Sequence, residues 1–391
     1  MISENRFQEL IVNPFSFLGV NPVCFGINRV EKLAEDIAEL NRKASEVLVI
    51  GDAGVAKVGI TDRIRRVLER SGYDVTVFSE LTGEPHAATV DKAGMLLRQL
   101  DHPFVVGVGG GSVLDVAKLA AVVAEDEIPA EDYALCARPF PKPRLKRIMI
   151  PTTAGTGSEV TRTAVFTTSK GNKVWAWGHE LLPDLVLLDP SLTVSLPADI
   201  TASTGLDAMV HAIEACTCRN RNPMADALGL HAIRLAKQHL ITAIEKPGDC
   251  DARGGMLIAA TLAGSAFAQT GTAAAHAIGH ALATIAGIPH GRAVTIGMEV
   301  LLPWNAEASP ETHAAVAEAF GCEKSADQSA PAFRALIERT GVDRSLDHKD
   351  IEPETLARVM MSAENLPMLE NNARPISKND ALVLARRMLV L

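Results

Sequence analysis

The chain has 391 residues, of which 47% are hydrophobic and 22% are charged, and its formal net charge at pH 7 is −9. This length and composition are typical of a globular protein with two or three domains. The acidic balance and an aromatic content of only 4% argue against nucleic acid as a partner, because such a surface needs basic side chains and stacking rings.

We expect neither a signal peptide nor a membrane span, because no apolar run is long and unbroken enough for either. The six cysteines lack the CxxC spacing of a metal site and the density of a disulfide framework. The sequence therefore favours a cytoplasmic protein with reduced thiols and no membrane partner.

Residues 1–190 alternate short apolar runs with amphipathic stretches. The expected strands lie within 15–30, at 47–52, 73–78 and 104–109, from Arg147 onward, and at 173–177 and 185–190. The expected helices are 30–44, about 55–70, 87–100 and 112–124, and the proline-rich segment 125–146 is expected to be a surface loop. Strands of nearly continuous apolar character between helices predict βαβ units around a buried parallel sheet, and hence a Rossmann-like α/β domain.

A glycine turn within this domain is the first candidate binding site. The segment GVGGGSVLDVAKLAA at 107–121 contains Gly109, Gly110, Gly111, Ser112 and Asp115. Ser112 is expected to be the N-cap of the next helix. Glycines let the backbone approach a ligand, and a helix N-terminus offers N–H groups and partial positive charge, which together suit a diphosphate. A plain glycine turn remains the alternative, because the segment is not GxGxxG.

Small hydroxyl side chains follow the strand that begins at Arg147. They are Thr152, Thr153, Thr156, Ser158 and Thr161, and they alternate with Gly155 and Gly157. Such a loop suits phosphate and ribose hydroxyls, although an ordinary Ser/Thr-rich turn has the same composition. Asp52, at the end of an earlier strand, is placed to accept adenosine ribose hydroxyls and would favour NAD over NADP, although a solvated turn residue explains it equally well.

From about residue 191 the strand pattern almost disappears. The segments 198–218, 224–245, 251–270 and 272–286 have helical patterns, as does most of the remaining chain. We therefore expect an all-helical second domain over residues 191–391.

Histidines gather in a small, apolar part of this domain. His276 and His280 are four residues apart and share a helix face, and His290 is expected at the start of the next helix. Asp207 and His211, upstream, are also four residues apart. Asp207, His211, His276 and His290 offer one oxygen and three nitrogens, a set that suits Fe(II) or Zn(II). Hydrogen-bonded core histidines are the alternative for each residue taken alone.

His280 would be a fifth protein ligand, and a site that must admit a substrate has little room for one. We therefore assign His280 a catalytic role as a proton carrier beside the ligands.

Six segments, taken in order, resemble the iron-containing (group III) alcohol dehydrogenase family over essentially the whole chain. They are GGGSVLDVAK, PTTAGTGSEVT, PDLVLLDP, TGLDAMVHAIEA, HAIGHALATIAGIPHG and NNARPIS. The resemblance implies the dehydroquinate synthase-like fold of that family, with the active site between an α/β and a helical domain, and a homodimer or larger homo-oligomer. It places the metal on Asp207, His211, His276 and His290, and dinucleotide contacts on Asp52, Gly109, Gly110, Gly111, Ser112, Thr152, Thr156, Thr161 and Lys173.

The implied activity is hydride transfer between NAD(H) and a small alcohol or its aldehyde or ketone, with a metal polarising the substrate oxygen. Two departures from the family pattern matter: His86 stands where members often carry Asn or Thr, and ACTCRNRNP at 215–223, which includes Arg219 and Arg221, has Cys and Arg where many members carry Tyr and Ser. Arginines that reached the substrate would favour a hydroxy acid or a phosphorylated or phosphono-aldehyde, but solvated loop positions suit them better.

Two other functional classes remain open. A dehydroquinate synthase-like lyase would also use NAD and a metal, but it needs several Lys and Arg for a polyanionic substrate, and few lie near the predicted ligands. A nucleotide-binding sensor would not need four metal ligands. The sequence decides neither the alcohol nor the choice between Fe(II) and Zn(II).

Overall fold

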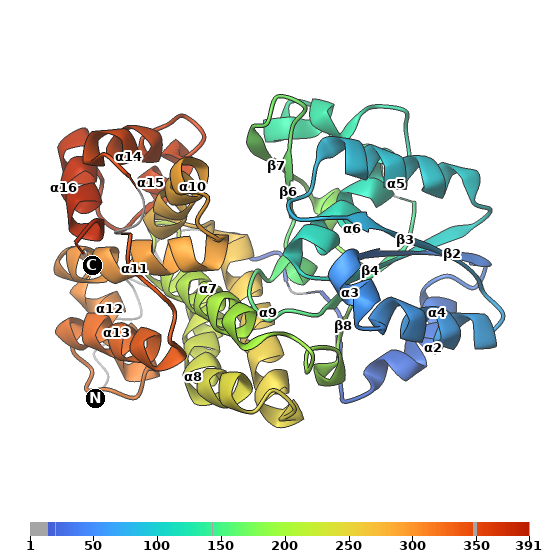
Figure 1. Ribbon diagram of the computed structural model, residues 1–391, viewed down its shortest axis with the longest axis horizontal. Helices are drawn as coiled ribbons and strands as arrows, with labels where there is room; N and C mark the ends of the chain where they lie inside the picture. The colour runs from blue at the N-terminus through green and yellow to red at the C-terminus, as the bar shows by residue number, and fades with distance from the viewer. Residues whose placement is uncertain (1–14, 20, 143, 347–349, 391) are drawn as a thin grey trace. The chain divides into compact units, whose positions relative to one another are not determined.

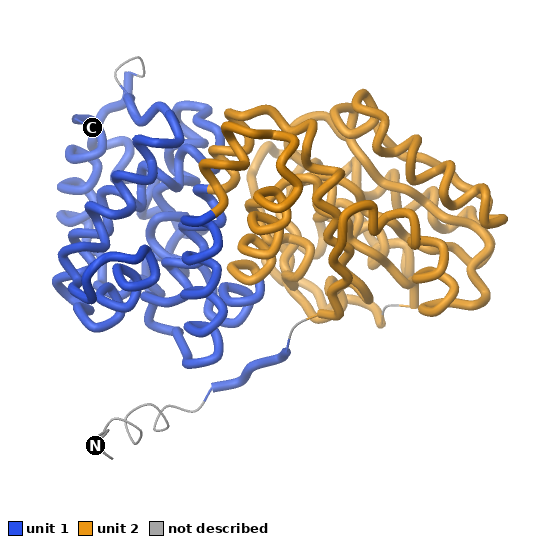
Figure 2. Tube along the Cα trace, turned by 90° about the horizontal axis from the view of Figure 1, so that it is seen from below, with its two compact units in different colours: residues 1–20, 206–238, 265–391 blue, residues 21–205, 239–264 orange. Residues whose placement is uncertain are grey.

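The structure is a computed structural model that describes residues 15–19, 21–142, 144–346 and 350–390 (Figure 1). The described residues form two compact units (Figure 2). Of the described residues, those within 21–205 and 239–264 form the sheet unit, and those within 15–19, 206–238 and 265–390 form the helical unit. The predicted domain boundary near residue 190 stays a prediction.

A parallel sheet is the centre of the sheet unit, as the sequence predicted. Among the described residues it has six strands in the order β1-β8-β5-β4-β2-β3. Their bounds are β1 (Val23–Phe25), β2 (Glu46–Asp52), β3 (Asp74–Leu81), β4 (Pro103–Gly109), β5 (Arg147–Pro151) and β8 (Leu185–Leu188). A separate antiparallel pair joins β6 (Thr163–Thr167), which was not predicted, to the predicted β7 (Lys173–Trp177).

Helices cover both faces of this sheet (Figure 1). They are α2 (Leu33–Leu40), α3 (Ala53–Lys57), α4 (Ile60–Arg70), α5 (Ala87–Gln99) and α6 (Gly111–Val123). Side chains alternate along β2, so that Val47 and Val49 pack with α2 and α4, whereas Leu48 and Ile50 pack with α5 and α6. Because both faces are buried, the strand reads as a continuous apolar run, which is why the sequence revealed it.

Short 3-10 helices fill several connections. They are η1 (Arg29–Lys32), η2 (Ala130–Cys136), η3 (Ser158–Val160), η4 (His179–Leu181), η5 (Pro190–Leu192) and η6 (Ala326–Gln328). The segment 125–146, predicted to be a loop, therefore contains one turn-like element, η2.

The second half of the described chain is helical, as predicted. Three long helices, α7 (Ala198–Thr217), α8 (Pro223–Glu245) and α9 (Cys250–Thr270), contribute residues to both units. The helical unit also contains α10 (Ala274–Ala286), α11 (His290–Ala308), α12 (Pro310–Ala319), α13 (Ser329–Thr340), α14 (Pro353–Met360), α15 (Leu366–Asn371) and α16 (Lys378–Met388). Within the described residues, no helix has the length and apolar character needed to cross a membrane.

Candidate metal centre and dinucleotide cradle

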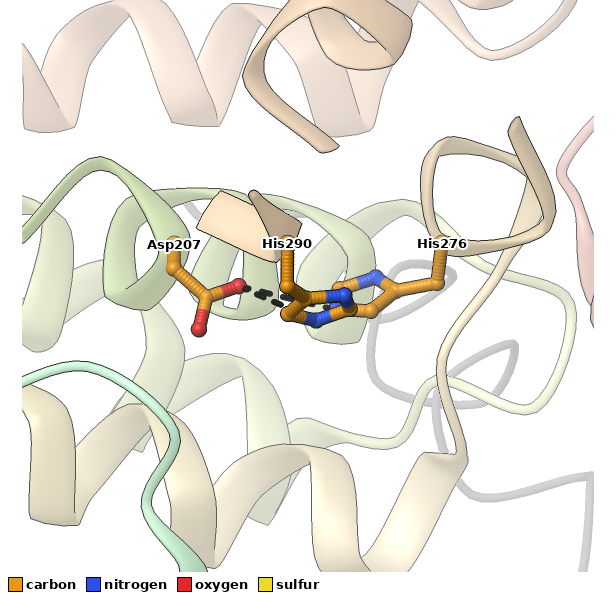
Figure 3. Close-up of side chains that lie close together, drawn as sticks. All are labelled: Asp207, His276 and His290. Carbon is orange, nitrogen blue, oxygen red and sulfur yellow. Dashed lines mark ion pairs between the residues drawn. The ribbon is translucent and has the colours of Figure 1, made fainter. Parts of the chain in front are cut away.

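The predicted ligands come from three helices of the helical unit. Asp207 and His211 lie one turn apart on α7, His276 lies in the first turn of α10, and His290 is the first residue of α11. Figure 3 shows Asp207, His276 and His290 converging from these helices. One ligand atom from each of these three side chains lies within 4.8 Å of the others.

Asp207 Oδ1 is the common point of the cluster. It lies 3.8 Å from Nε2 of His276 and 3.8 Å from Nε2 of His290. These separations are too long for hydrogen bonds, but two atoms that each lie about 2.1 Å from one metal ion can be up to about 4.2 Å apart. The same oxygen is buried and accepts no hydrogen bond from any described residue. A cation would satisfy it, so the donor set fits a divalent metal.

His211 lies beside this cluster. Its Nδ1 is 3.7 Å from Asp207 Oδ1, and its Nε2 is 2.9 Å from Nε2 of His276. Its ring stacks on Phe267, with centroids 4.4 Å apart. The structure thus brings His211 into contact with the cluster, and its role as a fourth ligand stays a prediction.

Burial sets the protonation of these groups. It raises the pKa of Asp207 to about 6, against the opposing influence of His290, and lowers the pKa of His276 to about 3. The imidazole of His276 is therefore neutral near pH 7, which is the form that binds a metal.

Glycines allow α10 and α11 to approach closely enough for His276 and His290 to meet. A Cβ at Gly279 would lie 2.4 Å from Cγ1 of Val294, and one at Gly297 would lie 3.0 Å from the carbonyl oxygen of Ala275. Larger residues at these contacts would push the helices apart and separate the two imidazoles.

His280 lies one turn after His276 on α10, as predicted. It is half-buried, and its ring centroid lies 5.7 Å from that of His290. This position is close to the cluster and retains some solvent access.

Glu214 is a residue of the site that the sequence analysis missed. It lies on α7 at the spacing i+7 from Asp207 and i+3 from His211, so all three share one face of the helix. Its carboxylate contacts Nδ1 of His276 at 2.6 Å. Burial raises the pKa of Glu214 to about 7, and the backbone N–H groups of Ala273 and Ala275 act in the opposite direction. The helical spacing from Asp207 was the one sequence signal that could have identified it.

Three of the predicted dinucleotide residues lie at the carboxyl ends of neighbouring strands in the sheet unit. Asp52 ends β2, Gly109 ends β4, and Thr152 follows β5, and these three strands are neighbours. The strand order reverses between β2 and β4, because β3 lies on the other side of β2. Ligands of open parallel sheets bind at the carboxyl ends of the strands at such a reversal.

The glycine turn at residues 109–111 packs against the loop of small hydroxyl residues at 152–161, which we call the threonine loop. A Cβ at Gly110 would lie 3.4 Å from Cγ2 of Thr153, and one at Gly111 would lie 2.7 Å from Oγ1 of Thr156. Glycine is therefore needed at Gly111 for the loop to approach, and the two segments form one polar surface.

The prediction that Ser112 is the N-cap of α6 was wrong. The helix begins at Gly111, and Gly110, in an extended conformation with ψ 179°, is its N-cap. Extended backbone of this kind is usual for an N-cap residue, and Ser112 is already the second residue of the helix. Because Gly110 provides no side-chain cap, N–H groups of the first turn are available to an anion.

Several predicted cofactor residues already have protein partners. Oδ1 of Asp52 accepts a hydrogen bond from Val55 N at 2.7 Å and caps α3. Lys173 pairs with Glu84 at 2.7 Å. Asp115 is buried, and one oxygen accepts a hydrogen bond from Val165 N at 2.9 Å. The contacts of these residues with a cofactor stay predictions.

Thr161 and Ser158 surround a buried lysine. Lys118 Nζ lies 3.2 Å from Oγ1 of Thr161, 2.8 Å from the carbonyl oxygen of Ser158 and 3.0 Å from Oδ1 of Asp115. Lys118 therefore links the threonine loop to α6.

The residues that depart from the family pattern have ordinary environments. Arg221 pairs with Asp226 at 2.5 Å, and the backbone N–H of Arg219 donates to the carbonyl oxygen of Asn371 at 2.8 Å. His86 is exposed and precedes α5.

Comparison with known proteins bears on the whole chain. Residues 21–190 match the family model "Iron-containing alcohol dehydrogenase", and residues 201–389 match the C-terminal model of the Fe-containing alcohol dehydrogenase family. The chain is 33% identical to choline dehydrogenase of Bacillus subtilis (strain 168), over 90% of each chain. It is 32% identical to long-chain-alcohol dehydrogenase 1 of Geobacillus thermodenitrificans (strain NG80-2), over 90% of this chain and 93% of that one.

A solved structure is also similar. Sulfoacetaldehyde reductase from Bifidobacterium kashiwanohense, determined in complex with NAD+, matches with a TM-score of 0.89 and 30% identity. The match covers 96% of this chain and 99% of that one.

Proposed function

Since the chain belongs to the iron-containing alcohol dehydrogenase family, whose members are oxidoreductases, we propose that it is an NAD-dependent alcohol dehydrogenase that uses a divalent metal, Fe(II) in the first place and Zn(II) as the alternative. It would interconvert a small alcohol and its aldehyde or ketone. The observation that carries this proposal is the convergence of Asp207, His276 and His290 on one buried point, with an oxygen that has no hydrogen-bond donor among the described residues.

When bound, the metal would lower the pKa of the substrate hydroxyl while the nicotinamide accepts a hydride from the carbinol carbon. The protein would supply binding and orientation. The three imidazoles would bind the metal as neutral ligands, and the carboxylate of Asp207 would neutralise part of its charge. Burial of Asp207 and His276 keeps water from competing for those positions.

The sheet unit would hold the dinucleotide. The backbone of Gly110 and Gly111 and the first turn of α6 would bind the diphosphate, with the threonine loop closing over it. Asp52, whose Oδ1 caps α3, would offer Oδ2 to the adenosine ribose and repel a 2′-phosphate. Asp115 would act indirectly, because its pairing with Lys118 helps to hold the threonine loop next to the diphosphate site.

His280 would carry the proton that the substrate hydroxyl releases. Its half-buried ring lies next to His290, so a proton taken near the cluster can be passed toward solvent. A group that is fully enclosed, such as His276, could not do this.

The substrate is best sought among three chemical classes, because the names of similar proteins include a cationic alcohol, a long-chain alcohol and an anionic aldehyde. Arg221 is already paired with Asp226, so it gives no preference to the anionic class. Net formation of NADH distinguishes the proposal from the lyase, in which the oxidation is transient.

The test uses the full chain stripped of metal and reloaded without oxygen with Fe(II) or Zn(II). We expect alcohol-dependent NADH formation, followed at 340 nm, only after reloading. His276→Ala should lose bound metal and turnover together, whereas His231→Ala, at an exposed position on α8, should lose neither. A fully active His276→Ala enzyme with unchanged metal content would refute the ligand assignment.

A further inference from the structure

Glu214 occupies an unusual environment for an acidic side chain. It is only 3% exposed and contacts the N-terminal turn of α10 from α7. Oε2 accepts a hydrogen bond from Ala273 N at 2.8 Å, and Oε1 accepts one from Ala275 N at 2.7 Å. The third contact, 2.6 Å, joins Oε2 to Nδ1 of His276. All three groups that contact the carboxylate can donate a hydrogen bond to it.

This arrangement determines which nitrogen of His276 carries its proton. The backbone N–H groups of Ala273 and Ala275 favour the ionised form of Glu214, and an ionised carboxylate only accepts hydrogen bonds, so the imidazole donates from Nδ1 and leaves the lone pair on Nε2. Nε2 is the atom that faces the cluster, 3.8 Å from Oδ1 of Asp207. The opposite tautomer would place a hydrogen where a metal ligand is required.

The same carboxylate also caps a helix. Ala273 is the N-cap of α10 and has no side-chain oxygen to accept from the first turn. Glu214 replaces that missing cap from α7, and its negative charge is favourable at a helix N-terminus. Asn371 holds the preceding connection, because its Nδ2 donates to the carbonyl oxygens of Thr270 and Thr272 at 2.9 and 3.0 Å. The backbone that leads into His276 is therefore held by two side chains, Asn371 at the connection and Glu214 at the first turn.

We propose that Glu214 is a positioning residue of the metal centre, which sets the Nδ1–H tautomer of His276 and fixes the first turn of α10 so that Nε2 presents its lone pair to the metal. This inference rests on the proposed function only in taking His276 as a ligand. Carboxylates that orient ligating histidines typically change metal affinity by about 10–100-fold.

The direct test reads the tautomer without metal, NAD or substrate. Full-length protein with 15N-labelled histidine is studied by long-range 1H–15N correlation, and His276→Ala identifies the His276 signals. We expect one His276 tautomer with its proton on Nδ1, both in the metal-free protein and after loading with Zn(II). A proton on Nε2 in the metal-free wild type would overturn the proposal, whatever the catalytic activity.

The second test compares two buried carboxylates. In Glu214→Gln the amide NH2 must face an N–H donor in either orientation, so we expect mixed tautomers and about 10–100-fold weaker Zn(II) binding in chelator competition. Glu299→Gln is the matched control, because Glu299 is 3% exposed on α11 and pairs with Arg334 and Arg344 at 2.9 and 2.8 Å. The Zn(II) affinity of Glu299→Gln should stay within about twofold of wild type, because the partners of Glu299 are two arginines and not a predicted metal ligand.

Equal losses of affinity in the two variants would show that Glu214 acts only through general stability, and would refute the proposal. If Glu214→Gln does not fold, the tautomer of His276 in the wild type still tests the proposal. A wild type with Nδ1–H on His276 but no alcohol-dependent NADH formation would contradict the proposed function and leave this inference standing.

Discussion

Two histidines one turn apart on α10 differ in burial, and the difference suits different chemistry. His276 is 3% exposed and held by Glu214, whereas His280 is half-buried next to His290. An enclosed neutral imidazole makes a fixed ligand, while a ring with solvent access can exchange protons. Burial thus separates two residues that the sequence pattern treats alike.

His280→Ala tests this distinction. We expect kcat to fall by about 100-fold, the lower end for proton-transfer groups, because water can partly replace the carrier. Metal content, measured by elemental analysis, should not change. The exposed His231→Ala serves again as the control for losing a histidine. Loss of metal from His280→Ala would mean that His280 is a ligand instead.

The sequence could identify Asp207, His211 and His276 as candidates because helical spacing pairs unusual residue types on apolar faces. It could not identify Glu214, because its partners are backbone N–H groups 59 and 61 residues away, and backbone groups leave no trace in the side-chain pattern. The error at Ser112 has a similar origin, because an extended Gly110 capped the helix without any side chain.

At the scale of elements, a buried cation joins α6 to the threonine loop. Lys118 is fully buried, and its ammonium donates to the carbonyl oxygens of Ser158 and Thr163 at 2.8 and 2.5 Å while pairing with Asp115 at 3.0 Å. Burial lowers the pKa of Lys118, and the charge of Asp115 opposes this shift. The helix that follows the glycine turn therefore also fixes the loop that faces that turn.

Lys118→Met should disrupt this anchor. We expect the free energy of unfolding to fall by about 3–5 kcal/mol, because Asp115 is left as a buried charge without its partner. The dissociation constant for NAD should rise as the loop loses its position. Urea unfolding and NAD titration measure the two effects. Lys146→Met is the control, because it removes a 45%-exposed lysine paired with Asp184. Its free energy of unfolding should fall by only about 0–1 kcal/mol. Equal losses in the two variants would contradict the anchoring role.

The central strands were predictable as elements, and β6 was not. β2 and β4 are buried on both faces, so each is a long apolar run that stands out from its surroundings. β6 has five residues that alternate between half-buried and buried; it pairs with β7, and its last residue, Thr167, also forms an isolated bridge with His86. A strand this short is specified by its partner rather than by its own sequence.

At the scale of the whole molecule, the fold class followed from α/β alternation in the first half and its loss in the second. Where each helix packs did not follow, because residues 239–264 of α8 and α9 belong to the sheet unit although they lie far beyond the last strand. Periodicity identifies the buried face of a helix but not the surface that covers it.

Asp207→Asn should reveal how the metal centre affects the stability of the whole molecule. The buried Oδ1 accepts no hydrogen bond from a described residue, and burial raises the pKa of Asp207 to about 6, so near pH 7 the metal-free protein holds a carboxylate in an unfavourable site. We expect the metal-free Asn variant to unfold at a higher temperature than the metal-free wild type. Zn(II) at 100 times its dissociation constant should stabilise the wild type by about 2.7 kcal/mol and the variant far less. Thermal unfolding with and without Zn(II) should therefore rank the two proteins in opposite orders. A variant that is less stable in both conditions would show that Asp207 stabilises the fold rather than the metal.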